Sequence, residues 1–110
     1  MLSLPSGIKV YLATAPVDMR KSHDGLANLV QKELQCEVLS GHLFVFFNRK
    51  ADRVKILYYE SNGLCLWYKR LNSGRYRVPK LAKRSQLISS SDLMCLLEKA
   101  STCSKNSVWQ

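Results

Sequence analysis

Two strand-like runs joined by a tight turn signal constrain the fold of this chain more than any other feature. Val54 to Tyr59 and Leu64 to Leu71 are rich in aromatic and aliphatic side chains, and Asn62-Gly63 stands between them. Asn and Gly both tolerate the positive φ that a two-residue hairpin turn needs. The pattern therefore predicts an antiparallel hairpin in which Ser61 lies opposite Leu64.

This register divides the hairpin into two faces. The first face is mainly apolar and is expected to lie in the core; it carries Val54, Ile56, Tyr58, Cys65, Trp67 and Leu71. The second face places tyrosines between cations and suits an exposed binding surface; it carries Lys55, Leu57, Tyr59, Leu66, Tyr68 and Arg70. A slip of one residue would exchange the two faces, so the assignment depends on the position of the turn.

Hydrophobic periodicity outside the hairpin predicts further short strands and two helices. The strands are expected at residues 8–13, 43–47, 75–78 and 87–88. Asp18 is placed to cap a first helix, and Ser90 or Ser91 to cap a second one that contains Leu93 to Leu97. The expected fold is α+β: an antiparallel sheet of four to six strands with two helices. We expect one domain over residues 1–100 and a polar C-terminal tail at 101–110.

The net charge is concentrated in one third of the chain. Residues 49–84 contain eleven Lys and Arg against two acidic residues, a net charge of +9, and the remaining residues are neutral in sum. Such an asymmetry indicates a polyanionic partner. The same segment holds four of the five tyrosines, and basic residues interleaved with aromatics can contact phosphates and stack on bases. The alternative is a solvated strand face whose aromatics lie in the core.

Composition excludes several classes of protein. No apolar run approaches the roughly 20 residues that cross a bilayer, and the N-terminus lacks the basic and apolar regions of a secretory signal. The four cysteines are far apart, without a C-x-x-C pair. This spacing fits neither a zinc site nor a disulfide framework. We therefore expect reduced thiols, a cytoplasmic location, and neither a metal nor a cofactor.

The acidic residues do not indicate an active site. Two-metal phosphoryl transfer needs several converging carboxylates, whereas the acids here are scattered along the chain. A Cys36–His42 nucleophile pair is conceivable because the two lie close in sequence. His42 between Gly41 and Leu43 more often orders the start of a strand through a hydrogen bond. We expect no catalytic residue and no enzymatic activity.

Nucleic-acid contact is instead expected from the basic and aromatic residues near the hairpin and near the first helix. Arg20 and Lys21 stand in that helix's first turn, where backbone N–H groups can also hold a phosphate. A structural ion pair of Arg20 with Asp24 is the alternative. The candidate binding residues are Arg20, Lys21, Arg49, Lys50, Arg53, Lys55, Tyr59, Tyr68, Lys69, Arg70, Arg75 and Arg77. Lys69 and Arg70 alternate in direction along a strand, so we expect only one of them on the binding face.

Several motifs together resemble a known family, the small accessory protein of the insertion sequence 66 family, often called TnpB. The motifs are Asp18-Met19-Arg20-Lys21, Asp24-Gly25-Leu26, Ser40-Gly41-His42-Leu43-Phe44-Val45-Phe46, Asn48-Arg49-Lys50, Asp52-Arg53-Val54-Lys55-Ile56-Leu57, Gly63-Leu64-Cys65-Leu66-Trp67-Tyr68-Lys69-Arg70-Leu71 and Gly74-Arg75-Tyr76. They stand in the family's order over about residues 4–98.

The resemblance implies an accessory role in transposition of a mobile genetic element, beside a separate DDE transposase. The partners expected from it are DNA, at the ends of the element, and the transposase or other proteins of the same element. The alternative is a protein–protein adaptor with little DNA affinity of its own. Its interface would then be the apolar run at 43–47 or the helix containing Leu93 to Leu97.

Overall fold

The computed structural model describes residues 7–79 and 83–98, which form one mixed five-stranded sheet with two helices. The strand order across the sheet is β4-β3-β2-β1-β5. In chain order the elements are β1 (Val10–Ala13), α1 (His23–Lys32), the short 3₁₀ helix η1 (Val38–Ser40), β2 (Leu43–Phe47), β3 (Arg53–Glu60), β4 (Gly63–Arg70), β5 (Ser85–Ile88) and α2 (Ser90–Glu98). The expected polar tail at 101–110 lies outside the described residues.

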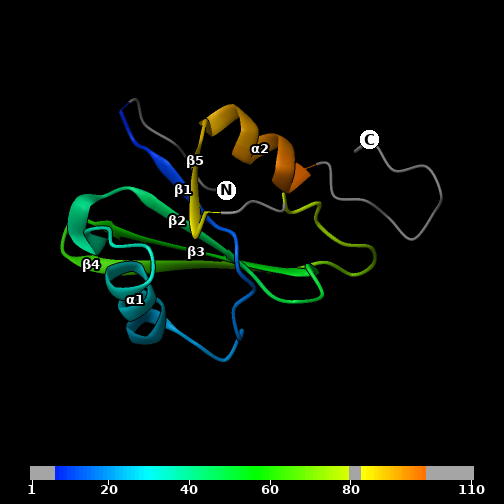
Figure 1. The fold of residues 1–110 in the computed structure, drawn as a ribbon, viewed down its shortest axis with the longest axis horizontal. Coiled ribbons are helices and arrows are strands. Elements are labelled where there is room, and N and C mark those ends of the chain that lie inside the picture. Colours follow the sequence, from blue (N-terminus) through cyan, green and yellow to red (C-terminus); the bar gives the residue numbers. More distant parts are fainter. Residues whose placement is uncertain (1–6, 80–82, 99–110) are drawn as a thin grey trace.

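The α+β class and the two helices are confirmed, and the sheet is antiparallel except at one pair of strands. β1 runs parallel to β2, with Val10 opposite Leu43, whereas all other neighbours are antiparallel. Parallel neighbours need a long crossover, usually a helix. Here the crossover contains α1, which lies below the sheet in Figure 1 while α2 lies above it.

One helix covers each face of the sheet, and a separate hydrophobic core lies between each helix and the sheet. All five residues of β2 are buried. Its odd-numbered side chains, such as Val45, face a cluster that includes Leu93, Leu96 and Leu97 of α2. Phe44 and Phe46 face the opposite way, into a cluster that includes Leu26 and Val30 of α1. The second hairpin face is therefore largely core, contrary to the expectation of an exposed surface, because α1 packs on Leu57 and Leu66.

The hairpin turn lies one residue earlier than its sequence signal indicates. Glu60 pairs with Gly63, so Ser61 and Asn62 form the turn, and Ser61 takes the positive φ of 58°. Each cross-strand partner is therefore shifted by two residues from the expected register. Because the side-chain period of a strand is two, this shift leaves the two predicted faces unchanged.

Other boundaries also differ from expectation. Residues 75–78 do not form a strand; only Arg75 makes an isolated bridge. The edge strand is longer than expected, because β5 pairs with β1 along all four of its residues.

The helix caps also differ from expectation. Ser89, rather than Ser90 or Ser91, caps α2, since its Oγ accepts from the backbone N–H of Asp92 at 3.0 Å. Ser22, and not Asp18, immediately precedes α1, so Arg20 and Lys21 lie before the helix rather than in its first turn as expected. The Asp18 carboxylate instead accepts from the backbone N–H of Arg20 and closes a turn there. Within the described residues, neither helix is long and apolar enough to span a membrane.

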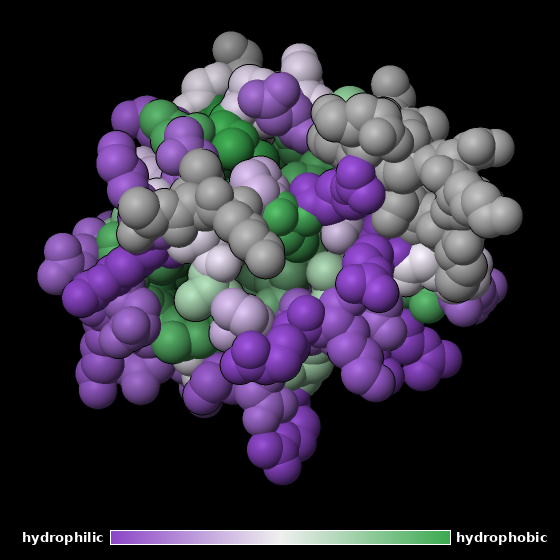
Figure 2. Space-filling view, turned by 45° about the vertical axis from the view of Figure 1, so that its right-hand side comes forward, coloured by the Kyte–Doolittle hydropathy of each residue, from purple (hydrophilic) through white to green (hydrophobic). Residues whose placement is uncertain are grey.

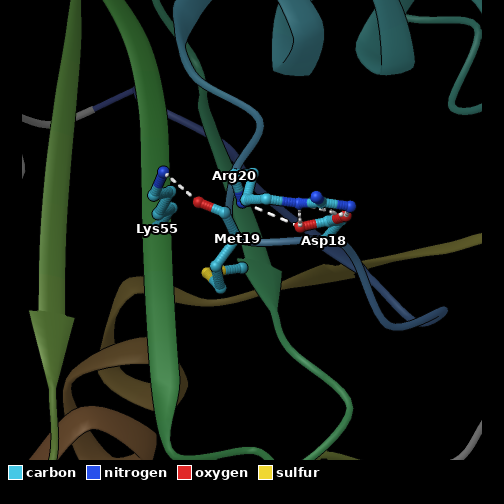
Figure 3. A network of polar contacts seen from close by, with 4 residues as sticks. All are labelled: Asp18, Met19, Arg20 and Lys55. Atoms are coloured by element: carbon cyan, nitrogen blue, oxygen red, sulfur yellow. Dashed lines mark hydrogen bonds and ion pairs between the residues drawn. The ribbon is translucent and has the colours of Figure 1, made fainter.

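Lys55 is a charged residue inside the core, although it was expected on a binding surface. Only 6% of it is exposed. Its Nζ donates to the backbone carbonyl of Met19 at 2.8 Å (Figure 3). It also donates to the carbonyl of Lys21 at 2.7 Å and lies 4.7 Å from the centre of the Tyr68 ring. A buried ammonium is tolerated only where such partners replace water. Lys55 therefore ties the segment before α1 to β3, and we do not include it in the candidate interface.

Replacing Lys55 with Met should destabilise the fold. Met keeps the unbranched stem but leaves two carbonyl acceptors without their charged donor, which should lower the free energy of unfolding by about 2 kcal/mol. Lys69→Met is the matched control, because Lys69 is exposed on β4 and should change stability by less than about 0.5 kcal/mol. Urea unfolding followed by circular dichroism measures both. Equal stability of the two variants would contradict the structural role of Lys55.

Candidate nucleic-acid interface

The strand directions gather most of the described cations at one end of the sheet. β1, β2 and β4 end there, and β3 and β5 begin there. In Figure 1 the loops at 48–52 and 71–79 lie together at the right-hand end of β3 and β4. We call this region the basic end; its cations are Arg49, Lys50, Arg53, Lys69, Arg70, Arg75, Arg77, Lys83 and Arg84. The charge-rich segment of the sequence is thus also compact in space.

Two grooves flank the β2–β3 loop at the basic end. The first, of about 450 Å³, is lined by residues that include Arg49, Lys50 and Arg53. The second, of about 830 Å³, shares Arg49 and Lys50 with the first and adds Arg75 and Arg77 above a less polar floor. Figure 2 turns this side forward and shows hydrophilic side chains around a less polar hollow. Arg49 and Lys50 therefore stand on the ridge between the grooves.

Asn48 holds the β2–β3 loop in shape. Its Oδ1 accepts from the backbone N–H groups of Asp52 and Arg53 at 3.1 and 3.0 Å, and its Nδ2 donates to the Asp52 carboxylate at 2.7 Å. This last bond, more than the nearby cations Arg53 and Lys50, lowers the pKa of Asp52. The loop in turn anchors the next segment, because the carbonyl of Ala51 accepts from the backbone N–H of Tyr76 at 2.6 Å.

Arg20 is engaged by a carboxylate, but by Asp18 rather than by Asp24. The guanidinium Nη2 lies 2.7 Å from Asp18 Oδ2, and Nε also donates to that carboxylate (Figure 3). The side-chain bond from Arg20, and then the bond from its backbone N–H, lower the pKa of Asp18 to about 2. Lys21 is exposed and lines a separate hollow of about 250 Å³ beside Arg84.

The remaining expected residues are divided between the basic end and other sites. Lys69 and Arg70 do point to opposite faces, since they pair with Val54 and Arg53 respectively. Tyr68 is 48% exposed beside this pair. Tyr59 pairs with Leu64 near the hairpin turn. That position is six residues along β3 from Arg53, or about 20 Å, so Tyr59 does not adjoin the basic end.

The two surfaces expected for an adaptor are not available for docking. β2 lies at the centre of the sheet and is buried throughout. Leu93, Leu96 and Leu97 of α2 face the core. The sequence of 43–47 predicts an apolar strand, but it does not show which strands lie on either side of that strand.

The possible Cys36–His42 pair also has another explanation. His42 Nδ1 accepts from the backbone N–H of Lys9 at 3.0 Å, which confirms its role in ordering the start of a strand. The Cys36 thiol donates to the carbonyl of Leu34 at 3.4 Å, and burial raises its pKa. A raised pKa disfavours the reactive thiolate. Among the described residues, no three His, Cys, Asp or Glu side chains are grouped to hold a metal ion.

Sequence reasoning missed Asn48, Lys83 and Arg84. Asn48 had a usable signal, because an Asn directly after a strand often binds the backbone N–H groups of the following turn. Lys83 and Arg84 come to the basic end because the side chain of Thr14 donates to both of their carbonyls, next to the pairing of β1 with β5. That placement depends on the strand order, for which the sequence holds no local signal.

Removing the Asn48 side chain should loosen the basic loop and change the titration of Asp52. Asn48→Ala deletes the bond that lowers the pKa of Asp52, so that pKa should rise toward its ordinary value of 3.8. It should also destabilise the fold by about 1–3 kcal/mol, because two backbone donors lose their acceptor. Carboxyl NMR titration and urea unfolding measure the two effects. Asn28→Ala, on the exposed face of α1, is the control. If Asn48→Ala left the titration of Asp52 unchanged, the proposed role of the Asn48 side chain in holding the loop would be contradicted.

The ion pair of Asp18 with Arg20 predicts a specific dependence on pH. The pKa of Asp18 is lowered in the folded state, so its contribution to stability is fully present above the ordinary value of 3.8 and is lost as the pH falls to about 2. In Arg20→Gln the midpoint should rise toward 3.8, although the backbone bond of residue 20 remains. Carboxyl NMR of Asp18 measures both midpoints. If the Asp18 midpoint were the same in Arg20→Gln as in the wild type, the guanidinium would not be the main cause of the lowered pKa.

Comparisons with known proteins place this chain in a family. Residues 8–106 match the model of the family described as IS66 Orf2 like protein. Two relatives from Sinorhizobium fredii (strain NBRC 101917 / NGR234), both described only as uncharacterized, are similar to the chain. Protein y4hO is 38% identical over 96 residues, covering 86% of this chain and 84% of its own. Protein y4jC is 34% identical over 79 residues, covering 72% and 68%. No solved structure matches. The chain belongs to the IS66 Orf2-like family.

Proposed function

We propose that this protein is a non-catalytic accessory factor of insertion-sequence transposition that binds DNA through its basic end, together with a separate DDE transposase. Membership of the IS66 Orf2-like family implies an accessory protein of an insertion sequence. The observation that carries the DNA-binding part is the gathering of nine cations at one end of the sheet, around two grooves that share Arg49 and Lys50.

The cations of the basic end suit phosphates. Arg49 and Lys50 are exposed on the ridge, and the two carboxylates nearby are already engaged, Asp52 by Asn48 and Asp18 by Arg20. Positive charge at this end is therefore only partly neutralised within the protein. Phosphate contacts of this kind fix the position of a nucleic acid and carry little sequence information. We therefore expect a binding mode dominated by the DNA backbone.

The engaged state of these carboxylates also supports a non-catalytic role. A carboxylate that stabilises an exposed ion pair or braces a loop is already committed to that bond, so it is poorly placed to activate a nucleophile. Chemistry on DNA would then belong to the transposase. The accessory protein would hold DNA or the assembled complex in place.

A second candidate function, that of a protein adaptor, is supported by the outer strand β5. β5 lies at one edge of the sheet and exposes 51% of Leu87. An edge strand presents backbone N–H and C=O groups that a strand from a partner can pair with. Binding of this type would change little with salt, whereas phosphate contacts weaken steeply.

Salt titration of DNA binding tests the proposal. The affinity for terminal-repeat duplex, scrambled duplex and single strand should fall steeply with salt, with a slope near −0.9 per neutralised phosphate on duplex. Arg49→Glu/Lys50→Glu should weaken binding by at least about tenfold at ~50 mM salt and reduce the slope by about 2.

The matched control is Lys9→Glu/Lys32→Glu, which changes the net charge by the same amount at exposed residues outside both grooves. It should weaken binding far less than the variant on the ridge. Undetectable binding at ~50 mM salt would refute the DNA-binding proposal. If both double variants lost the same amount of DNA affinity, binding would depend on the total charge of the protein and not on the basic end.

A further inference from the structure

We propose that Arg53, Arg70 and Tyr68 form a clamp for one unpaired nucleotide, so that the basic end prefers single-stranded nucleic acid to duplex. This inference rests on the proposed DNA-binding function and specifies its ligand. The phosphate would lie between the two guanidinium groups, and the base would stack on the exposed ring of Tyr68. The three residues lie on one face of β3 and β4, on two successive rungs of that face, with the Val54–Lys69 rung between them pointing to the other face.

The first step is the pairing of two cations. Arg53 lies directly opposite Arg70 across the β3–β4 ladder, which brings their Cβ atoms to about 5 Å. Like charges directly opposite each other destabilise a sheet. Neither guanidinium forms an ion pair with a carboxylate among the described residues; Arg53 Nη1 lies 3.5 Å from Tyr68 Oη. An anion held between the two would remove the repulsion.

The second step is the position of an aromatic ring next to this pair. Tyr68 lies opposite Lys55, two residues along the strands from the arginine pair and on the same face, and therefore about 7 Å from it. The Lys55 ammonium covers one side of the ring at 4.7 Å from its centre, and the contact with Arg53 holds the hydroxyl. The ring is held from one side while 48% of the residue is exposed. An immobilised, half-exposed ring is a suitable platform for a base, since stacking tolerates any sequence.

The third step is access. β4 is an outer strand, so nothing lies beyond Tyr68 and Arg70 on that side within the described part of the sheet. In a duplex the bases are paired and stacked on one another, so a ring on a flat strand edge can contact only the backbone. An unpaired base can turn onto the ring while its own phosphate reaches the arginines. The combination of ring and cation pair therefore favours a single strand.

Three variants and three probes test the clamp. The probes are a fluorescent oligothymidine, a blunt-ended duplex with the same number of phosphates, and an oligouridine that distinguishes RNA from DNA as the source of the unpaired base. The wild-type protein should bind the single strands more tightly than the duplex. Tyr68→Ala should weaken single-strand binding by about tenfold and leave duplex binding nearly unchanged. Tyr68→Phe, which keeps the ring, should retain the single-strand affinity.

Arg70→Gln provides a test that should not disturb folding, because Arg70 is exposed and its side chain forms no hydrogen bond or ion pair among the described residues. It should weaken single-strand binding by at least about fivefold and reduce the salt slope by about 0.7, the value for one phosphate contact on a single strand. Lys69→Gln, the adjacent residue on the opposite face, is the control and should have a smaller effect.

The outcomes separate this inference from the function on which it rests. Duplex binding at least as tight as single-strand binding, or equal single-strand affinity of Tyr68→Ala and the wild type, would overturn the clamp while leaving DNA binding by the basic end intact. Binding to none of the probes at ~50 mM salt would instead refute the proposed function itself. A greater affinity for oligouridine than for oligothymidine would retain the clamp and identify RNA as its ligand.

Discussion

A strand that is apolar on both faces must be covered on both faces, and this constraint organises the whole molecule. β2 carries five buried residues in succession, and its neighbours are buried at three of the four residues of β1 and at four of the eight residues of β3. α1 and α2 provide the two covers. With both faces of the sheet covered, its central strands offer little exposed surface for charge. The cations of the basic end accordingly lie at strand ends, in loops and on the outer strand.

Lys55 shows how the core and the basic end are connected. Its ammonium binds two carbonyls of the segment that precedes α1 and lies over the ring of Tyr68 at the edge of the sheet. The segment that it holds contains Asp18 and Met19, both of which line the first groove. One buried charge thus positions part of the groove and also the aromatic side chain beside Arg53. Its contribution to binding would be indirect, through the placement of these neighbours.

The sequence predicted the fold class because its local signals are strong. The run at 43–47 matches β2 residue for residue, and the alternation around the hairpin assigned the two faces correctly even though the turn was misplaced by one residue. What the sequence could not reveal was the order of the strands. Val10 lies beside both Leu43 and Ile88, and these pairings join segments far apart in the chain that carry no mutual signal.

The same limitation explains the errors at the candidate site. Lys55 and Tyr59 were assigned to one exposed surface because a strand pattern defines a face but does not say what covers it. α1 covers that face along most of its length, so only the rungs nearest the basic end remain accessible. Along this face the rungs change from Tyr59–Leu64 and Leu57–Leu66 to Lys55–Tyr68 and finally Arg53–Arg70. The gradient from apolar to charged along a single face places the exposed aromatic ring between the core and the paired arginines. A nucleotide presents the complementary groups in the same order: its base has a flat face that can stack on the ring, and its phosphate carries a negative charge that can pair with the arginines.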